Sequence, residues 1–295
     1  MAKFTLKRTA LCATAACLAV LSSAAAQNKT PIPDFSANNA GWTGMGGLTA
    51  MPGSPEPVGQ DPSRPLVGNI GRLPGQQPTF PYADLTNPNL TPFAREGLRK
   101  VNEAADAGFA MYSRESRCWD TGVPLYLNNP AQPTFFLQTP KEVTTIWQMD
   151  QQVRHIYLNV PHSANPKPSW YGESVGHYDG DTLVVDTIGQ NTRSFLDNFR
   201  TPHSDKLHVI ERYRLVDNGN TLEAEVTIED PVALLQPLHV VKHWRKVQGP
   251  MTESRCADGE MVNPFGQKTD PIPIAKTPEF TRSCRVHPAS TPAYE

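Results

Sequence analysis

A pair of alternating segments joined by Asn218-Gly219 constrains the fold of this chain more than any other feature. Residues 207–230 read LHVIERYRLVDNGNTLEAEVTIED, with hydrophobic and polar residues alternating on both sides of the Asn-Gly pair. Alternation with a period of two is typical of strands, and Asn-Gly favours a two-residue type I′ turn. This turn predicts a hairpin whose wet face pairs opposite charges: Arg214 with Glu223, Arg212 with Glu225, and His208 with Glu229.

Glu211 stands out in this hairpin because its side chain is expected on the opposite, hydrophobic face. That face carries Val209, Tyr213, Leu215, Leu222, Ala224, Val226 and Ile228. A carboxylate among apolar side chains must find a partner, raise its pKa or serve a purpose. Two readings follow: a structural glutamate hydrogen-bonded to a neighbouring Tyr or Arg, or a functional group inside a pocket.

Residues 1–26 have the pattern of an export signal. Three basic residues are followed by the apolar run Leu11–Leu21 and by an A-x-A cleavage site at 24–26. The expected location is therefore periplasmic or secreted. Removing three of the 27 basic residues leaves 24 against 29 acidic ones, a net charge of −5 without a basic cluster, so no nucleic-acid partner is expected. No later stretch is apolar and long enough to predict a membrane span.

Three cysteines follow the predicted signal: Cys118, Cys256 and Cys284. Exported proteins occupy an oxidising compartment, so one disulfide and one odd thiol are expected. Three pairings are possible, and the sequence does not choose among them.

The rest of the chain is expected to form one barrel domain with irregular segments on either side. Residues 27–90 are rich in proline, which removes backbone donors, so they predict an extended arm that cannot build a sheet. Residues 91–248 are expected to hold one short helix and the barrel. Thr91-Pro92 should begin the helix, with Phe93, Leu98, Val101 and Ala105 as its apolar stripe. Residues 249–295 predict an irregular tail packed on the barrel.

Eight strands are predicted from the period of two, and most of them are joined by short turns. They are Thr134–Gln138, Glu142–Met149, Val153–Val160, Gly172–Tyr178, Asp181–Thr187, Leu207–Val216, Thr221–Glu229 and Leu238–Val247. Sequential strands with short connections pair antiparallel, which predicts an all-β, up-and-down barrel resembling the lipocalin architecture. A two-sheet sandwich is the alternative.

A second hairpin, residues 171–187, brings two carboxylates and a histidine to one face. The turn is expected at Asp179-Gly180 or one residue later, and in either register Glu173, His177 and Asp186 share a side. Two neighbouring carboxylates can serve acid–base chemistry, because one pKa rises while the other falls. Alternatively, this face is solvated and the two charges avoid each other.

Further candidate site residues lie near the strands. His203 is a possible base or a loop cap; Arg154, Tyr157 and Tyr171 could polarise a ligand oxygen; Trp170 and Tyr213 offer aromatic stacking. No metal site is predicted, because the histidines lack ligand spacing on one element. A nucleophile elbow, a phosphate loop and a dinucleotide fingerprint are absent from the sequence, so no cofactor is expected.

Three segments carry a resemblance to a known family. They are YGESVGHYDGDTLVVDT at Tyr171–Thr187, PHSDKLHVIERYR at Pro202–Arg214, and TIEDP at Thr227–Pro231. The chain resembles exported bacterial proteins of largely unassigned function that carry a GDTLVVDT hairpin, and the resemblance covers residues 118–256. It implies a lipocalin-type barrel. Relatives often carry Arg in place of His177 and His in place of Glu173, so the resemblance assigns no catalytic role to either residue.

The leading hypothesis is a cofactor-independent lyase, hydratase or isomerase acting on a small aromatic molecule in a barrel pocket. Glu211 or Glu173 would be the base, tuned by Asp186 and His177. The alternative is a carrier that holds a small hydrophobic ligand without transforming it. A third hypothesis is an envelope protein with a filled barrel whose Pro-rich arms contact a partner.

Overall fold

A computed structural model of the chain describes residues 32–36, 40–64, 81–107, 120–128 and 132–252. The predicted export signal, the three cysteines after it and most of the predicted C-terminal tail lie outside the described residues. In the described part of the chain, no helix is both apolar and long enough to cross a membrane.

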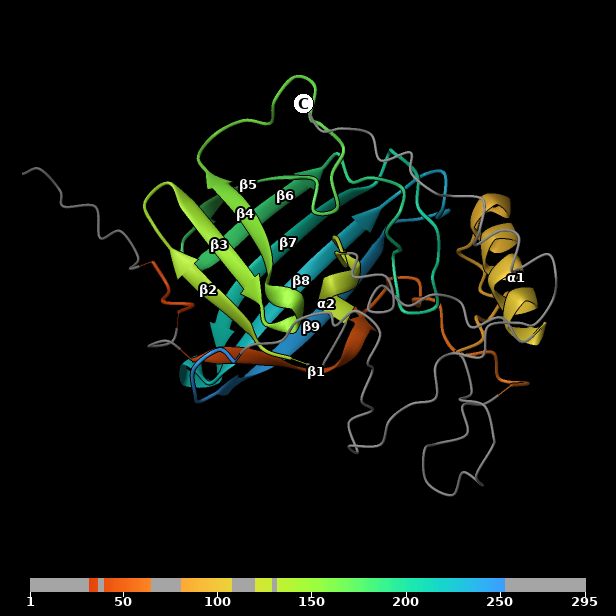
Figure 1. Cartoon of the computed structure of the whole chain (residues 1–295), viewed down its shortest axis with the longest axis horizontal. Helices are drawn as coiled ribbons and strands as arrows, with labels where there is room; N and C mark the ends of the chain where they lie inside the picture. The colour runs from red at the N-terminus through yellow and green to blue at the C-terminus, as the bar shows by residue number, and fades with distance from the viewer. Residues whose placement is uncertain (1–31, 37–39, 65–80, 108–119, 129–131, 253–295) are drawn as a thin grey trace, which may run out of the picture. The chain divides into compact units, whose positions relative to one another are not determined.

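Nine strands close into a barrel in sequence order (Figure 1). They are β1 (Gly41–Ala50), β2 (Thr134–Gln138), β3 (Glu142–Trp147), β4 (Gln152–Leu158), β5 (Glu173–Asp179), β6 (Thr182–Ile188), β7 (His208–Val216), β8 (Thr221–Glu229) and β9 (Leu238–Val247). All eight predicted strands are confirmed, with ends within two residues of those expected. The prediction of a mainly β, closed barrel is therefore correct.

One pair of neighbouring strands is parallel, which corrects the prediction of a purely antiparallel barrel. β4 and β5 run in the same direction, whereas every other neighbouring pair, including β1 and β9, is antiparallel. Strand directions can alternate all the way around a closed barrel only when the number of strands is even. With nine strands one parallel pair is required, and the long connection 159–172 allows it because a parallel return must cross from one end to the other.

The ninth strand, β1, lies inside the segment that was predicted to be unable to build a sheet. The prediction was wrong because prolines are not spread evenly through that segment. Gly41–Ala50 contains none, and its Trp42 is fully buried in the core. The register with β9 shifts between Met45 and Thr49, at a bulge where Gly46 has a φ of 71°. The glycines of this segment therefore shape a strand rather than a loop.

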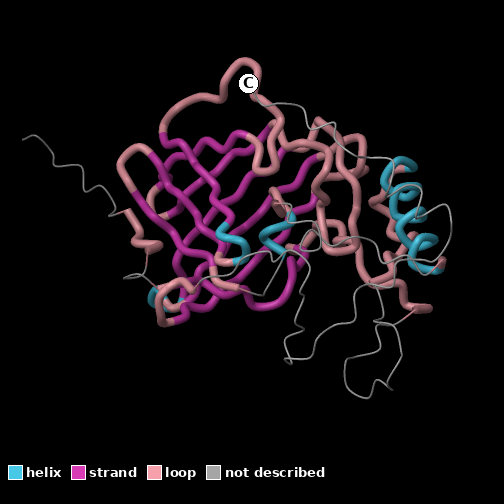
Figure 2. The backbone as a smooth tube through the Cα atoms, viewed as in Figure 1, coloured by secondary structure: helices cyan, strands magenta, loops and turns pink. Residues whose placement is uncertain are grey.

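Helices are few in the described chain (Figure 2). The predicted helix is confirmed as α1 (Pro92–Asp106), and the Thr91 side chain caps it by accepting a hydrogen bond from the Ala94 backbone. Leu98 and Val101 are buried as expected, but Phe93 is 46% exposed and does not belong to the buried stripe. A second, one-turn helix, α2 (Leu125–Asn128), was not predicted; it contributes Tyr126 to the barrel core.

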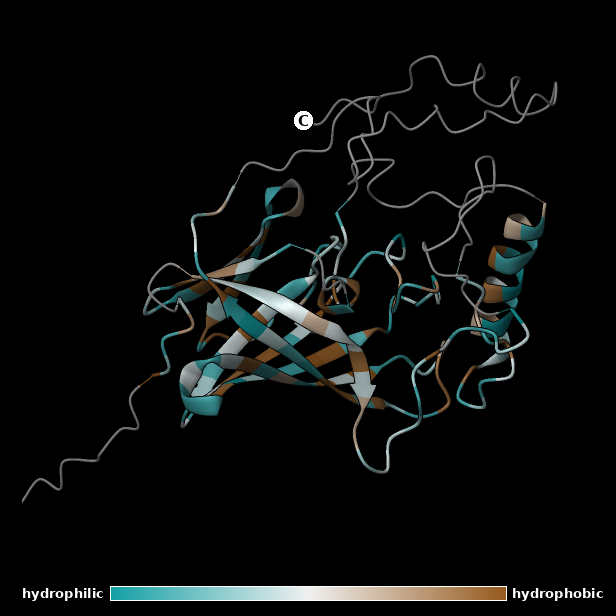
Figure 3. Ribbon diagram, turned by 90° about the horizontal axis from the view of Figure 1, so that it is seen from below, coloured by the Kyte–Doolittle hydropathy of each residue, from teal (hydrophilic) through white to brown (hydrophobic). Residues whose placement is uncertain are grey.

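The β7–β8 register is the predicted one. Arg214 lies opposite Glu223, Arg212 opposite Glu225 and His208 opposite Glu229. The loop differs from the predicted two-residue turn, because strand pairing ends at Val216 and Thr221 and Asp217, Asn218 and Gly219 all have positive φ. Hydrophilic and hydrophobic residues alternate along the barrel strands in Figure 3. This alternation turns Glu211 inward, toward the barrel core.

The β5–β6 hairpin adopts the later of the two registers considered. Asp179 pairs with Thr182, so Gly180-Asp181 forms the turn and Asp186 lies opposite Val175 rather than opposite Glu173. Glu173, His177 and Asp186 still share one face, but that face is the outside of the barrel, where His177 is exposed. The carboxylates of Glu173 and Asp186 therefore lie on the outer face of the barrel and not in its interior.

Candidate functional site

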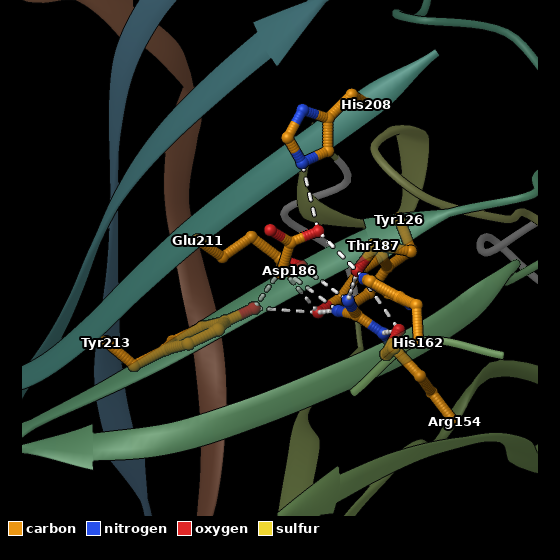
Figure 4. A network of polar contacts seen from close by, with 9 residues as sticks. Tyr126, Arg154, His162, Asp186, Thr187, His208, Glu211 and Tyr213 are labelled. Atoms are coloured by element: carbon orange, nitrogen blue, oxygen red, sulfur yellow. Dashed lines mark hydrogen bonds and ion pairs between the residues drawn. The ribbon is translucent and has the colours of Figure 1, made fainter. Parts of the chain in front are cut away.

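An ion pair between Arg154 of β4 and Glu211 of β7 lies inside the barrel (Figure 4). The two side chains are 1% and 0% exposed, and Arg154 Nη2 lies 2.5 Å from Glu211 Oε2. A second contact joins Arg154 Nη1 to Glu211 Oε1 at 3.0 Å. The pair is thus bidentate, the geometry in which a guanidinium holds a carboxylate most strongly.

Every N–H group of the Arg154 guanidinium has an acceptor. Besides Glu211, the guanidinium donates to the hydroxyls of Tyr126 at 2.7 Å, Thr187 at 2.8 Å and Ser174 at 3.1 Å. Tyr213 in turn donates to Glu211 Oε1 at 2.5 Å. A buried polar network is stable only when its members are satisfied, and this network meets that condition. The structural reading of Glu211, hydrogen-bonded to a neighbouring Tyr and Arg, therefore accounts for its burial.

Neighbouring groups and burial determine the protonation states of Arg154 and Tyr213 in this network. Burial alone would lower the pKa of Arg154, but Glu211 together with Tyr126 and Tyr213 outweighs burial and raises this pKa above its ordinary value. Burial, and then the charge of Glu211, raise the pKa of Tyr213 well above its usual range. Arg154 stays positive and Tyr213 stays neutral, so neither group is free to exchange protons with a ligand at neutral pH.

A second polar network runs across the outside of the same wall. His162, from the loop between β4 and β5, lies between Glu173 and Asp186, with 3.0 Å between ring nitrogen and carboxylate oxygen on each side. Asp186 also contacts His208 Nε2 at 2.9 Å, and His208 Nδ1 lies 3.3 Å from Glu229. The predicted carboxylate pair is thus bridged by an imidazole. Figure 4 shows Asp186 and Thr187, neighbours on β6, turned toward the two different networks.

A cavity of about 560 Å³ opens in the wall beside these networks. It lies where β4 loses its neighbour, because β4 and β5 pair only from Ile156 to Leu158 on the β4 side. Predicted ligand-contacting residues converge on it: Arg154, Tyr157, Trp170 and Tyr171 line the cavity together with Glu173. The cavity therefore gathers four of the five predicted binding residues and one predicted catalytic residue.

His155 is the group in this cavity that is best placed to move a proton. Its Nδ1 lies 2.5 Å from Glu142 Oε1, and the hydrogen bond from His155 lowers the pKa of the Glu142 carboxyl. The ring is 54% exposed and stacks on Tyr157 with centroids 6.3 Å apart. Among the described residues, Nε2 of His155 has no hydrogen-bond partner. A carboxylate that holds Nδ1–H leaves Nε2 as the basic atom facing a ligand.

The remaining predicted residues lie away from this cavity. Tyr213 is buried in the interior network, and His177 lies exposed near the β5–β6 turn. His203 is buried in a loop, where Nε2 contacts Ser194 Oγ at 2.8 Å and Nδ1 contacts the Ser204 carbonyl at 2.9 Å. Burial lowers the pKa of His203, which therefore stays neutral and fixes the loop before β7.

Sequence analysis missed His155, Glu142 and His162 as candidates, although two signals pointed to them. The alternation of β4 places His155 and Tyr157 on one face, and the pairing of β3 with β4 brings Glu142 beside them. For His162 the only local signal was its position in a loop next to a predicted carboxylate pair.

Comparison with known proteins gave no match. No protein-family model matches the chain, and neither a curated protein nor a solved structure shows significant similarity to it. In the described ranges, no group of three or more His, Cys, Asp or Glu side chains is arranged to hold a metal ion. The resemblance to exported barrel proteins stays a prediction, and the wall cavity is the candidate site that the geometry supports.

Proposed function

We propose that this chain is an exported enzyme with a lipocalin-like barrel that binds a small aromatic molecule in the wall cavity and acts on it by acid–base chemistry. The observation that carries the proposal is that aromatic side chains, the Lys167 cation and a histidine oriented by a carboxylate converge on one cavity. Its volume of about 560 Å³ falls within the range of small-molecule sites. Periplasmic or extracellular location belongs to the same proposal.

The aromatic residues favour a flat, partly apolar ligand. Tyr157 is 47% exposed and Trp170 is partly exposed, so both offer ring surface to the cavity. Aromatic pairs gain about 0.5–1.5 kcal/mol beyond the area that they bury. Lys167 also lines the cavity and makes no ion pair with a described carboxylate. An acidic group on the ligand would complement this charge.

The reaction that fits these groups begins with removal of a proton. His155 Nε2 would accept the proton while Glu142 stabilises the imidazolium that forms. The phenol of Tyr157 stacks beside His155 and could donate to an oxygen of the ligand or of a leaving group. A lyase, hydratase or isomerase step of this kind requires a base that removes a proton and a donor that protonates an oxygen. Arg154 and Glu211 contribute from inside the barrel, where their ion pair holds β4 and β7 in place.

A carrier is the second candidate, and the interior network favours it. Glu211, the predicted base, is fully buried and committed to Arg154 and Tyr213, so it offers no free acid or base to a ligand. If His155 served only as a surface ion-pair partner of Glu142, the cavity would bind a ligand without changing it.

Replacing His155 with Gln separates these two functions. We expect binding of benzoate, 4-hydroxybenzoate or a similar aromatic acid to change by less than about threefold, because the cavity keeps its shape. We expect turnover of an accepted substrate to fall about 10²–10⁴-fold, the usual contribution of a general base. Affinity would be measured by titration calorimetry and turnover by product chromatography.

His239→Gln is the matched control, because His239 is also an exposed histidine on the outer face of a strand, and the one hydrogen bond of its side chain in the described chain is to Thr227. It should leave binding and turnover unchanged. Binding without any turnover in the unmodified protein would favour the carrier, and failure to bind any aromatic of the panel would contradict both functions.

A further inference from the structure

The segment 161–168 of the β4–β5 loop is held to the barrel by two adjacent residues. His162 contacts Glu173 and Asp186, while the Ser163 backbone N–H and hydroxyl each donate to Glu173 at 2.7 Å. No other hydrogen bond or ion pair joins this segment to a strand in the described structure. Ser163, Asn165 and Lys167 from the same segment line the wall cavity. His162 and Ser163 therefore hold one side of the cavity together, and His162 is the one of the two with a titratable ring.

The hydrogen bonding of this anchor depends on protonation. Both nitrogens of His162 face carboxylate oxygens, and so do both nitrogens of His208. A carboxylate only accepts hydrogen bonds, and a neutral imidazole has one N–H to donate. All four contacts are hydrogen bonds only when both rings carry two protons. Loss of a proton turns a nitrogen lone pair toward a carboxylate oxygen.

We propose that His162 is a protonation-dependent clasp: the doubly protonated ring holds residues 161–168 against the barrel, and the neutral ring leaves them held by Ser163 alone. The groups that face the clasp are Glu173 from β5 and Asp186 from β6, followed by His208 from β7 and Glu229 from β8. This inference deepens the proposed function, on which it rests, because the clasp would regulate access to the wall cavity.

The neighbouring groups set the direction of the pH dependence. The hydrogen bond to Asp186 raises the pKa of His208 above its ordinary 6.5, and the hydrogen bond from His208 lowers the pKa of Asp186 below its ordinary 3.8. The contribution of His208 is complete below 6.5 and is lost as the pH rises through its raised pKa. The contribution of Asp186 is complete above 3.8 and is lost as the pH falls through its lowered pKa. The hydrogen bond from the Ser163 hydroxyl lowers the pKa of Glu173 below its ordinary 4.5, so the contribution of Glu173 is complete above 4.5. The clasp is therefore strongest between pH 4.5 and 6.5.

Methyl relaxation by NMR tests the clasp, because the segment contains Ala164. With alanine methyl groups labelled in the full chain, we expect the Ala164 order parameter to be about 0.85 at pH 5.5 and below about 0.6 at pH 9. Ala224, which is buried in β8, reports on the barrel and should stay rigid at both values. His162→Gln should leave Ala164 mobile at both pH values. His239→Gln, the matched histidine control, should behave as the unmodified protein does.

The result that overturns the inference is an Ala164 order parameter in the unmodified protein that is the same at pH 5.5 and pH 9. A rigid Ala164 in His162→Gln overturns it as well. Asp186→Asn provides an independent check, because it keeps the side-chain shape and removes the charge; Ala164 should be more mobile at pH 5.5 in this variant. None of these measurements uses a ligand, so they test the clasp even if no aromatic molecule binds and the proposed function fails.

Discussion

Replacing Arg154 with Met is expected to lower the free energy of unfolding by about 3–5 kcal/mol, because removal of one partner leaves a buried charge uncompensated. Glu211 is 0% exposed and would lose two of its hydrogen bonds. Ser174 and Thr187 would lose a donor as well. Urea denaturation followed by circular dichroism measures the change.

Two further variants show whether the buried charge is the cause. The double replacement Arg154→Met with Glu211→Leu removes both charges and should recover most of the lost stability. Arg212→Met is the matched control: Arg212 lies next to Glu211 on β7 but pairs with Asp179 on the surface, with 44% and 65% exposed side chains. Exposed pairs contribute little, so this control should change stability by less than about 1 kcal/mol. A loss below 1 kcal/mol in Arg154→Met would contradict the account of the interior network.

Replacing Lys242 with Met is expected to stabilise the protein by about 2 kcal/mol at pH 7. This effect is opposite in sign to that of Arg154→Met, although both side chains are charged and buried. Lys242 is fully buried on β9, donates to the Gly46 carbonyl and forms no ion pair with a carboxylate in the described structure. Burial lowers its pKa to about 8. Keeping this ammonium charged inside the barrel costs free energy that Met does not require, and the lost hydrogen bond to Gly46 offsets part of the gain.

The pH dependence gives this prediction a second test. The pKa of Lys242 is about 8 when folded and 10.5 ordinarily, so between these values the unfolded chain binds more protons and stability rises with pH. The gain from Lys242→Met should therefore shrink from pH 8 to pH 10.5. Lys246→Met on the same strand is the control, since Lys246 is only partly buried and its replacement should give a small change at pH 7. A destabilising Lys242→Met at pH 7 would be inconsistent with an unpaired, buried ammonium.

Local chemistry was sufficient to predict much of the barrel from sequence. The register of β7 and β8 followed from Asn218-Gly219, because turn geometry fixes which residues are opposite each other. That register turned Glu211 inward, and the alternation of β4 placed Arg154 on the face opposite His155 and Tyr157. The same alternation, applied to β9, predicts that Lys242 points inward, because Val240 and Trp244 on either side of it on that face are hydrophobic.

Features that depend on barrel closure were not predictable from local patterns. Arg154 and Glu211 lie on strands separated by β5 and β6, so their contact exists only after the sheet curves around its core. The same holds for β1, whose short proline-free run became a strand because β2 and β9 both offered it an edge. The position of His162 between Glu173 and Asp186 depends on the path of a Pro-containing loop, which carries no periodic signal.

The most direct test of the central claim, that the wall cavity is the ligand site, is an NMR titration of the tryptophan indole N–H groups with 4-hydroxybenzoate. Trp170 lines the cavity, whereas Trp42 and Trp244 lie in the barrel core. The account predicts that the Trp170 signal shifts with a saturable dependence on ligand, and that the Trp42 and Trp244 signals do not move. Shifts of Trp42 or Trp244 with a stationary Trp170 would place the ligand inside the barrel and contradict the account.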